Sequence, residues 1–401
     1  MTISRMQSSM NLVMSASKIT VVTCVALVTL YATYAVAEEL STSSTTETLS
    51  PAQTRQALQK VIDSAAPGSQ ADLAHSEPLT IDGPLRITKP LRVRGLNLQL
   101  PPRLAKTPLL IVESSDVRIT ESRFAGNGDT VGQGERRSLV EVTAGRFALT
   151  DCVFENGSKN GVTVGPPASG GDVSHVVIRD VVGRRVIRDV VSIAGAGEKG
   201  FVRNVLVENV QAYDSELRGA VEVSDGASDV TVRGVFAERC VYAVDVQDHD
   251  SPGELLFNVR IEDVRARVCR HAVRTALDPN GHRRLFIRGV IAEWCDVPLR
   301  IDNIDDVTIS DVLIEGRRLD PTETEDIETV FRIKNCNNVA IRDVSIANAG
   351  KLKDAIDIVD STEVRVSSLR VDNVQSSQAQ DGQSEITQRH SASAGSGDHL
   401  R

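Results

Sequence analysis

The sequence predicts an all-β protein built as a parallel β-helix, and three observations lead to this prediction. A strand-like unit recurs eleven times between residues 91 and 371, at spacings of 22 to 32 residues. A second, shorter strand motif follows the unit in most of these repeats. Only 3% of the residues are aromatic although 41% are hydrophobic, so the core must consist of small and β-branched side chains repeated many times.

The chain begins with a segment that has the features of a secretory signal peptide over residues 1–37. Arg5 and Lys18 are its only charged residues, and an apolar run from Ile19 to Ala37 ends in the small-x-small sequence Ala-Val-Ala. We therefore expect a secreted or periplasmic protein that is not held at the membrane after cleavage. A retained anchor helix is the alternative, because the run nearly spans a bilayer.

Charge and cysteine content narrow the range of partners. Removing residues 1–37 takes away two cations and changes the formal net charge from -9 to -11, so we expect no binding to nucleic acid. Five cysteines remain, and an odd number leaves at least one thiol unpaired within a chain. Cys240, Cys269 and Cys295 each fall ten residues after the start of their unit. They are expected to stack inside the coils, where bonding between neighbours is sterically feasible.

The repeated unit reads apolar-x-apolar-x-(Asp/Asn/Gly)-apolar-x-apolar, as in Leu91–Leu98. Alternation with period two marks a strand that has one buried face. The alternation slips by one residue in the middle of the unit, where Gly, Asn or Asp tolerates left-handed backbone angles. Each unit is therefore expected to be a strand, a one-residue bend and a second strand. The bend residues are Gly95, Asp151, Asp180, Asn209, Gly234, Asp263, Gly289, Asp311 and Asp343.

The second motif, for example Ala220-Val-Glu-Val223, supplies a third strand after a variable loop. Three short strands in each turn of about 27 residues are typical of a parallel β-helix, whose coils stack about 4.8 Å apart. Leucine-rich repeats would need a helix in each unit, and the loops are too short and polar for one. Propeller blades would be longer and contain four strands. We therefore expect about 11 stacked coils.

The segment before the repeats carries a resemblance to a known superfamily. Ser50–Gly68 starts with a Ser N-cap and a Pro at the first helical position, followed by an apolar stripe. Together with the phrase Pro84–Gly95, it resembles the opening of secreted proteins of the pectin-lyase-like superfamily. The resemblance implies a right-handed, single-stranded β-helix over 50–375 with a capping helix at about 51–66. Residues 38–49 are then a flexible linker, and 376–401 a disordered tail rich in Ser, Gln, Gly and Ala.

In that superfamily the ligand groove runs along the strand that corresponds to the second motif. The middle polar residue of each motif should point outward there. Three residues of this row, Arg274, Arg300 and Arg332, should then lie about 5 Å apart on successive coils, which is unfavourable unless anions lie between them. Arginine binds carboxylates in a bidentate manner. An acidic polysaccharide is therefore the expected ligand, whereas neighbouring aspartates that neutralise the row are the alternative. The expected outward row is Glu141, Thr163, Ser192, Glu222, Asp245, Arg274, Arg300, Arg332 and Asp357.

Candidate site residues follow from this row and from the residues beside it. If the protein is a lyase, a cation must neutralise a uronate carboxylate and a base must take the adjacent proton, so His271, Arg274 and Arg300 are the catalytic candidates. Tyr242 and Trp294 are expected in loops beside the groove, where rings stack on sugars or pack the loops. The full set of expected substrate-binding residues is Glu222, Tyr242, Asp245, His249, Trp294, Asp302, Arg332 and Lys334.

No metal site or other cofactor is expected. His249 with Asp248 and Asp250 is the one place where a cation such as Ca²⁺ could bind, but the spacing matches no known cage. Arg332-Ile333-Lys334 matches the R-I-K tripeptide of polygalacturonases, yet the N-T-D, D-D and G-H-G motifs of that family are missing. Polygalacturonase activity is therefore not inferred.

The sequence thus predicts an exported β-helix protein that binds an acidic polysaccharide. It leaves open whether the protein also cleaves this polymer, as a lyase or a hydrolase. The alternatives are a non-catalytic carbohydrate-binding module of the cell envelope and a purely structural rod. The polymer, its linkage and the oligomeric state are not fixed by the sequence.

Overall fold

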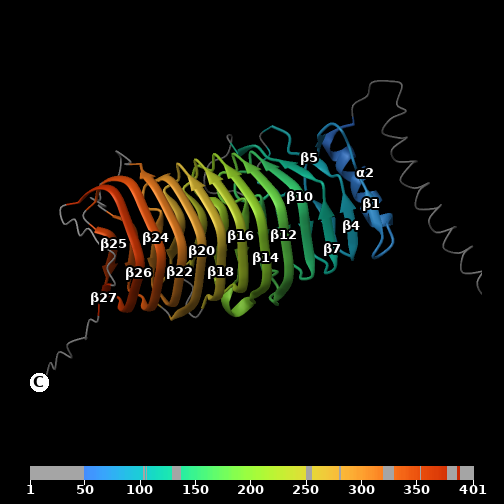
Figure 1. Cartoon of the computed structure of the whole chain (residues 1–401). Coiled ribbons are helices and arrows are strands. Elements are labelled where there is room, and N and C mark those ends of the chain that lie inside the picture. Colours follow the sequence, from blue (N-terminus) through green and yellow to red (C-terminus); the bar gives the residue numbers. More distant parts are fainter. Residues whose placement is uncertain are drawn as a thin grey trace, which may run out of the picture.

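The computed structural model describes residues 49–102, 104, 106–128, 137–249, 255–279, 281–318, 329–352, 354–376 and 386–388. They form a rod of stacked coils with one helix, α2 (Pro51–Ser64), at its N-terminal end (Figure 1). The expected signal peptide and nearly all of the expected linker lie outside the described residues. Within the described ranges, no helix combines the length and the hydrophobicity that crossing a bilayer requires.

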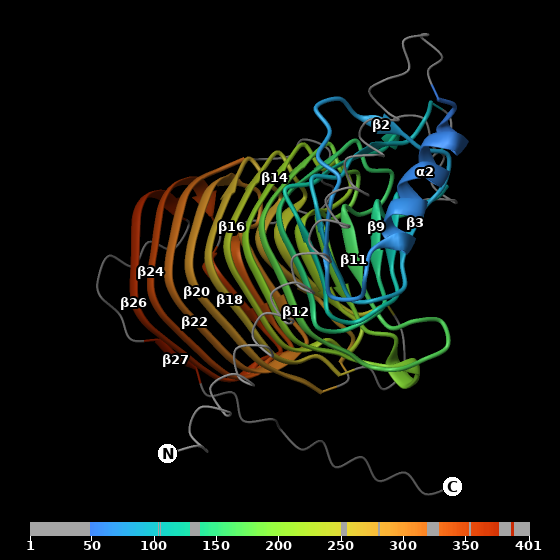
Figure 2. The same cartoon turned by 90° about the vertical axis from the view of Figure 1, so that its right-hand side faces the viewer.

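Two sheets form the walls of the coils (Figure 2). The 11-stranded sheet contains the short strands of the second motif, and all of its neighbouring strands are parallel. Its strands are β3 (Leu85–Ile87), β6 (Leu110–Val112), β9 (Val140–Val142), β11 (Val162–Val164), β13 (Val191–Ala194), β15 (Gly219–Ser224), β17 (Tyr242–Gln247), β19 (His271–Ala276), β21 (Leu299–Asp302), β23 (Thr329–Lys334) and β25 (Asp354–Val359).

The 16-stranded sheet holds the longer repeated unit, and its coils also pair in parallel. Its strands are β1 (Gln70–Asp72), β2 (Leu79–Thr80), β4 (Leu91–Arg94), β5 (Asn97–Gln99), β7 (Val117–Thr120), β8 (Arg123–Ala125), β10 (Phe147–Glu155), β12 (Val173–Arg184), β14 (Val202–Tyr213), β16 (Ser228–Glu238), β18 (Phe257–Arg267), β20 (His282–Cys295), β22 (Ile304–Arg317), β24 (Asn337–Leu352), β26 (Thr362–Ser376) and β27 (Ile386–Gln388). A 3₁₀ turn at Gly197–Lys199 lies between β13 and β14.

The predicted bends are confirmed at every one of the nine positions. Their φ angles lie between 53° and 77°, which is the left-handed region that Gly, Asn and Asp tolerate best. In the first coils the bend separates two strands, such as β4 and β5. From β10 onward the two halves run through the bend as one strand, as at Asn209 in β14. Three expected strand segments per coil therefore form two sheets.

The helix α2 covers the open end of the first coil, as expected. Ser50 is its N-cap: the Ser50 hydroxyl accepts from the Gln53 N–H (3.3 Å), and the Gln53 side chain accepts from the Ser50 N–H (2.9 Å). This reciprocal pair satisfies two N–H groups that a helix start otherwise leaves free. Leu58 and Ile62 on the inner face are buried in the core, so the helix is fixed against the first coil by packing.

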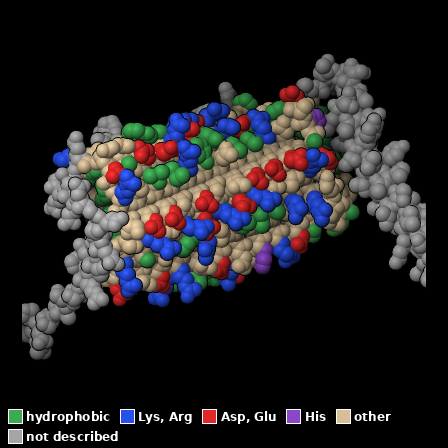
Figure 3. Space-filling model, in the orientation of Figure 1, with side chains coloured by type: hydrophobic (Ala, Val, Ile, Leu, Met, Phe, Trp, Pro, Cys, Tyr) green, Lys and Arg blue, Asp and Glu red, His purple; other side chains and the backbone are tan. Residues whose placement is uncertain are grey.

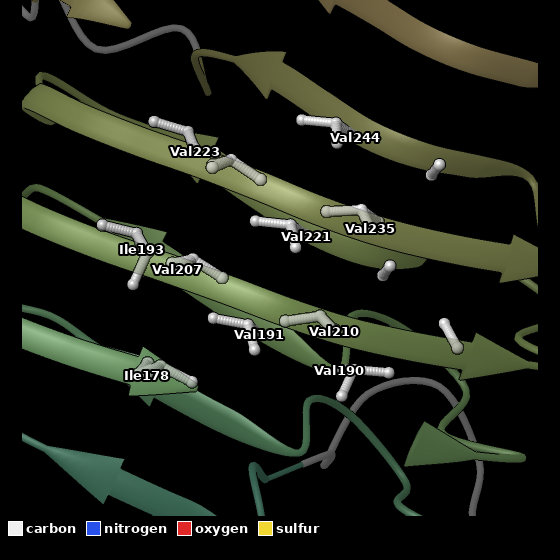
Figure 4. Packing of buried hydrophobic residues seen from close by; sticks show 14 of the residues in the cluster. Ile178, Val190, Val191, Ile193, Val207, Val210, Val221, Val223, Val235 and Val244 are labelled. Carbon is white, nitrogen blue, oxygen red and sulfur yellow. The ribbon is translucent and has the colours of Figure 1, made fainter. Parts of the chain in front are cut away.

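The core is a continuous column of branched aliphatic side chains from both sheets (Figure 4). Val191 and Val221 from the short strands face Val207 from the long strand β14, and all three are fully buried. Each coil repeats nearly the same small residues at the same places, so little room is left for rings. This arrangement explains the low aromatic content of the sequence.

The C-terminal end differs from the expectation in one respect. Three residues of the segment expected to be disordered form β27, which pairs antiparallel with Val364–Val366 of β26. The last coil has no following coil, and its unpaired backbone groups offer a template for such a strand. Residues 377–385 and 389–401 lie outside the described part of the chain.

Charged residues on the 16-stranded sheet are arranged in paired rows along the rod (Figure 3). Arginines of one coil contact carboxylates of the next, as in Arg233–Glu208 (2.6 Å) and Arg265–Glu293 (2.9 Å). Such exposed pairs contribute little to stability individually. They matter here because they provide a contrast with the cations of the 11-stranded sheet.

Candidate functional site

The predicted outward row exists, and its residues occupy the predicted register. Glu222 pairs in register with Asp245, Asp245 with Arg274, and Arg274 with Arg300. The row continues through Arg332 to a final aspartate, Asp357. Its environment is not uniform, because Glu222 and Asp245 are buried, whereas Arg300 borders an open depression.

Glu222 is 2% exposed and is surrounded by donors. Its carboxylate accepts from the Ser192 hydroxyl (2.6 Å), the Arg218 guanidinium and the Gln247 amide. These contacts satisfy a charge that burial would otherwise make costly. Glu222 is expected from the sequence to contact substrate. In this structure it is buried, and its carboxylate instead holds the side chains of its neighbours by hydrogen bonds.

Asp245 is fully buried and bound by Arg274 in a bidentate ion pair. The Arg274 Nε donates to one carboxylate oxygen (2.8 Å) and the terminal nitrogen to the other (2.5 Å). Burial raises the pKa of the Asp245 carboxyl, and the hydrogen bonds from Arg274 oppose that rise. The guanidinium also lies over the Tyr242 ring, 5.1 Å from its centroid. The charge of Arg274 is therefore neutralised by Asp245, and Arg274 is not a free cation for a ligand.

Tyr242 does not offer a stacking surface, since it is 1% exposed. Its hydroxyl donates to the Asp189 carboxylate two coils away (2.7 Å). The intervening coil has Gly219 in register with Tyr242, where a Cβ atom would lie 1.7 Å from the Tyr242 carbonyl oxygen and 2.8 Å from its ring. A residue without a Cβ atom is thus required at position 219, so that the Tyr242 side chain can cross this coil and reach Asp189.

Asp189 is a buried acid that the repeat pattern missed. It is fully buried, and its second carboxylate oxygen has no hydrogen-bond partner among the described residues. Burial, together with the negative charge of Glu222, raises the pKa of the Asp189 carboxyl well above its ordinary value. These conditions favour the neutral form of Asp189. The sequence signal was its place directly before the second motif, where Asn160, Tyr242 and His271 also stand.

His271 is placed inside the protein, so the expectation of a base in the groove is corrected. The side chain is 2% exposed, and its Nδ1–H donates to the Val297 carbonyl (2.7 Å). Burial lowers the pKa of His271 to about 3. The ring is therefore neutral near pH 7, but it has no access to a polymer on the surface.

The other two histidines near the groove differ in exposure. His249 is half exposed, and its Nδ1 lies 2.8 Å from Asp225, a contact that raises the pKa of the imidazole. His282 is fully buried: the Leu256 N–H donates to Nδ1 (3.1 Å), which leaves the proton on Nε2, 3.0 Å from Asp248. His282 thus holds Asp248 in place.

Trp294 lies outside the groove and not in a loop beside it. It is the penultimate residue of β20 in the 16-stranded sheet and is 52% exposed. Its ring lies over Gly316 of the next coil, where an added Cβ would come within 2.8 Å of the indole. Tyr213 likewise ends β14, beside Phe236, with 5.7 Å between ring centroids. The repeat alignment does not show where the long strands end, so the expectation of a loop position for Trp294 is corrected.

An open depression of about 560 Å³ lies at the C-terminal ends of the short strands β17 to β23. Arg300 in its wall donates to Asp302 (2.8 Å), whose other carboxylate oxygen is buried without a partner in the described chain. Asn335 donates to the Asn303 side chain (2.6 Å) along the rim. The lining residues are Asp248, Ala276, Leu277, Asp278, Arg300, Asp302, Asn303, Lys334, Asn335 and Asp360.

Two cations of β23 lie at or beside the depression without a partner among the described residues. Lys334 lines the depression, and Arg332 lies beside Arg300 in the outward row. Neither side chain forms an ion pair or a hydrogen bond with any residue that the structure describes, and the Arg332 Nε is buried without a partner. Of the three arginines in the predicted row, two are thus neutralised by aspartates and the third is not.

No group of three or more His, Cys, Asp or Glu side chains among the described residues is arranged to hold a metal ion. Asp250, which completes the trio expected to attract Ca²⁺, lies outside those residues. All five described cysteines are buried and free, including the stacked Cys240, Cys269 and Cys295. Burial raises the pKa of Cys152 to about 12, so a nucleophilic role is disfavoured there.

No protein-family model matches the chain, and a search of curated proteins also finds no match. Among solved structures, the chain is similar to the surface adhesin PfbA of Streptococcus pneumoniae, with 12% identity over 81% of this chain and 89% of that one and a TM-score of 0.41. It is also similar to an exopolygalacturonase from Thermotoga maritima, with 10% identity over 84% and 89% and a TM-score of 0.44.

A third similar structure is the catalytic domain of an α-1,3-glucanase in complex with nigerose, with 10% identity, a TM-score of 0.46 and coverage of 80% of this chain and 64% of that one. The parallel β-helix that the sequence predicted is confirmed by the stacked coils and by the parallel pairing of the coils within both sheets. Likeness at this level does not extend to activity, so the function must be argued from the side chains of this chain.

Proposed function

We propose that this protein is exported and binds an acidic polysaccharide in the depression at the ends of β17 to β23. The observation that carries the proposal is the pair of unpaired cations, Arg332 and Lys334, on one short strand at this depression. Several cations on the opposite sheet, such as Arg233 and Arg265, are paired with carboxylates of a neighbouring coil, whereas Arg332 and Lys334 stand next to each other on one face without such partners among the described residues. A carboxylate of the polymer would complete the pairing that β23 lacks.

The remaining lining residues suit the hydroxyl groups of a sugar. Asp278, Asp302 and Asp360 offer carboxylate oxygens, and Asn303 and Asn335 add amide groups. Successive short strands present these groups about 4.8 Å apart. A polymer laid along the rod would therefore meet a new set of donors and acceptors at each coil.

Binding is better supported than cleavage. A lyase needs a base at the surface, but His271 is buried and Arg274 is held by Asp245. Arg300 is held in the same way by Asp302, and a guanidinium does not give up its proton near neutral pH. None of the three catalytic candidates, His271, Arg274 and Arg300, is therefore available as a free base in the described groove.

A screen of mature protein against immobilised polyuronates, glycosaminoglycans and neutral glucans tests the proposal. Retention of acidic polymers without new reducing ends or unsaturated products is expected. Lys334→Gln should weaken retention about tenfold, because a charge-assisted hydrogen bond contributes about 1.5–3 kcal/mol. Arg342→Gln, on the exposed face of β24, is the matched control and should bind normally. Equal retention of neutral and acidic polymers would contradict the proposal, and no retention at all would favour a structural rod.

A further inference from the structure

A column of basic residues follows the other end of the 11-stranded sheet, at the turns that lead into its strands. Lys159, Arg188 and Arg218 each stand two residues before a second motif, on three consecutive coils. The backbone places them in line, since the Arg188 N–H donates to the Lys159 carbonyl (3.0 Å). Arg137 and Arg270 occupy corresponding turns further along the rod and are exposed.

The carboxylates around this column do not balance its charge. Arg218 binds Glu222, which also lies 3.6 Å from the terminal nitrogen of Arg188. Asp189 lies 4.0 Å from the Arg188 Nε, and its burial favours the neutral form. Glu141 acts on Lys159 through its charge and also lies 3.8 Å from Arg137. The three cations therefore share one buried carboxylate, Glu222, and a second one, Glu141, that Arg137 also contacts.

Two groups in the column lack a hydrogen-bond partner among the described residues. Lys159 forms no ion pair with any described residue, and the Arg188 Nε is buried without a hydrogen-bond partner. Lys159 is half-buried, and burial together with the charge of Arg188 lowers the pKa of its ammonium group. An anionic ligand would remove the repulsion between these two side chains and supply the missing acceptor.

We infer that Lys159, Arg188 and Arg218 form a second subsite, which binds a carboxylate or sulfate group of the same acidic polymer. This inference rests on the proposed function for the other end of the groove. Arg188 precedes β13, and Lys334 lies on β23, five coils further along. The two subsites are thus roughly 24 Å apart along the rod at the usual coil spacing.

Two linked subsites predict a dependence on chain length. An oligosaccharide too short to span roughly 24 Å can occupy only one subsite at a time. A longer chain gains the second contact as an intramolecular event at high effective concentration, without any new contact elsewhere. Affinity should therefore increase sharply once the chain spans both subsites, and only slowly with further length.

The test compares a size series of one polyuronate on wild type, Lys159→Gln and Lys159→Arg by isothermal titration calorimetry. Lys159 has no described partner, so its replacement leaves no buried charge behind, and equal melting temperatures will confirm folding. Lys159→Gln should weaken the binding of long chains about tenfold and leave the affinity for short chains unchanged. Lys159→Arg keeps the positive charge and should bind long chains about as tightly as wild type. Lys60→Gln on the exposed side of α2 is the control.

The outcomes separate the two proposals. If long and short chains bind Lys159→Gln as tightly as wild type, the second subsite is refuted and the first stands. If affinity in wild type does not change with chain length, the second subsite is likewise refuted. If neither size of chain binds wild type, the proposed function itself fails.

Discussion

Replacing Arg274 with methionine removes the one cation that, among the described residues, forms an ion pair with the buried carboxylate of Asp245. Asp245 is fully buried, and both of its oxygens accept from Arg274, at 2.8 and 2.5 Å. Breaking a buried pair by removing one partner costs about 3–5 kcal/mol, because the remaining charge is uncompensated. Methionine retains an apolar chain that can cover the Tyr242 ring, so the loss of packing is smaller than the electrostatic loss.

The sign of the pH dependence follows from burial. Burial raises the pKa of Asp245 above its ordinary value even with Arg274 present, and without Arg274 it rises further. The folded variant therefore holds a proton that the unfolded chain releases. The stability that the variant loses relative to wild type is largest above the raised pKa of Asp245. This loss decreases as the pH falls toward about 4, the pKa of the carboxyl in the unfolded chain.

Differential scanning calorimetry at neutral and mildly acidic pH measures this effect. At about 2 °C per kcal/mol for a large domain, Arg274→Met should melt roughly 6–10 °C below wild type at neutral pH and recover part of that loss in acid. The double variant with Asp245→Asn removes the charge and should melt above the single variant at neutral pH. A loss below about 2 °C, or the same loss at both pH values, would refute the account of this pair.

Two further predictions concern the same strands. Gly219→Ala should destabilise the fold by about 1–3 kcal/mol, the usual cost of overpacking, since the new Cβ would meet the Tyr242 carbonyl oxygen at 1.7 Å; an unchanged melting temperature would count against the described path of Tyr242. His249→Gln tests the contact with Asp225, which raises the pKa of His249. A raised pKa stabilises the fold below the unfolded value of about 6.5 and ceases to do so above the folded value. The melting temperature of this variant should therefore fall more at about pH 5.5 than at about pH 8.5, and an equal change at both would exclude the ion pair.

Much of the fold could be predicted because each coil repeats the same local pattern. The period-two alternation fixed which residues of the short strands face outward, and the observed register joins Glu222, Asp245 and Arg274 as expected. The bends were predictable for the same reason, since Gly, Asn and Asp tolerate the left-handed region best. These inferences needed no knowledge of contacts between distant side chains.

The environment of the site could not be predicted in the same way. Alternation assigns a side chain to the outer face, but it does not show that Arg218 and Arg274 cover Glu222 and Asp245. It also fails at the residue directly before the second motif, where the chain leaves a turn. His271 occupies that place and lies inside the protein.

The basic column is visible in the sequence, although the predicted site does not include it. Lys159, Arg188 and Arg218 recur at a fixed distance before the second motif, as regularly as the row of arginines within it. The unpaired state of Lys159 and Arg332 could not be seen at that stage, because it depends on which carboxylates each side chain can reach. Those partners come from coils roughly 25–30 residues away along the chain.

The most direct test of the central claim compares one polyuronate with its carboxyl-reduced form, in which the backbone and linkages are the same and the charge is gone. The account predicts that the mature protein binds the acidic polymer at least tenfold more tightly at low salt, and that added salt reduces this preference. Equal affinity for the two polymers would contradict it, because the unpaired cations of β23 would then have no role in recognition.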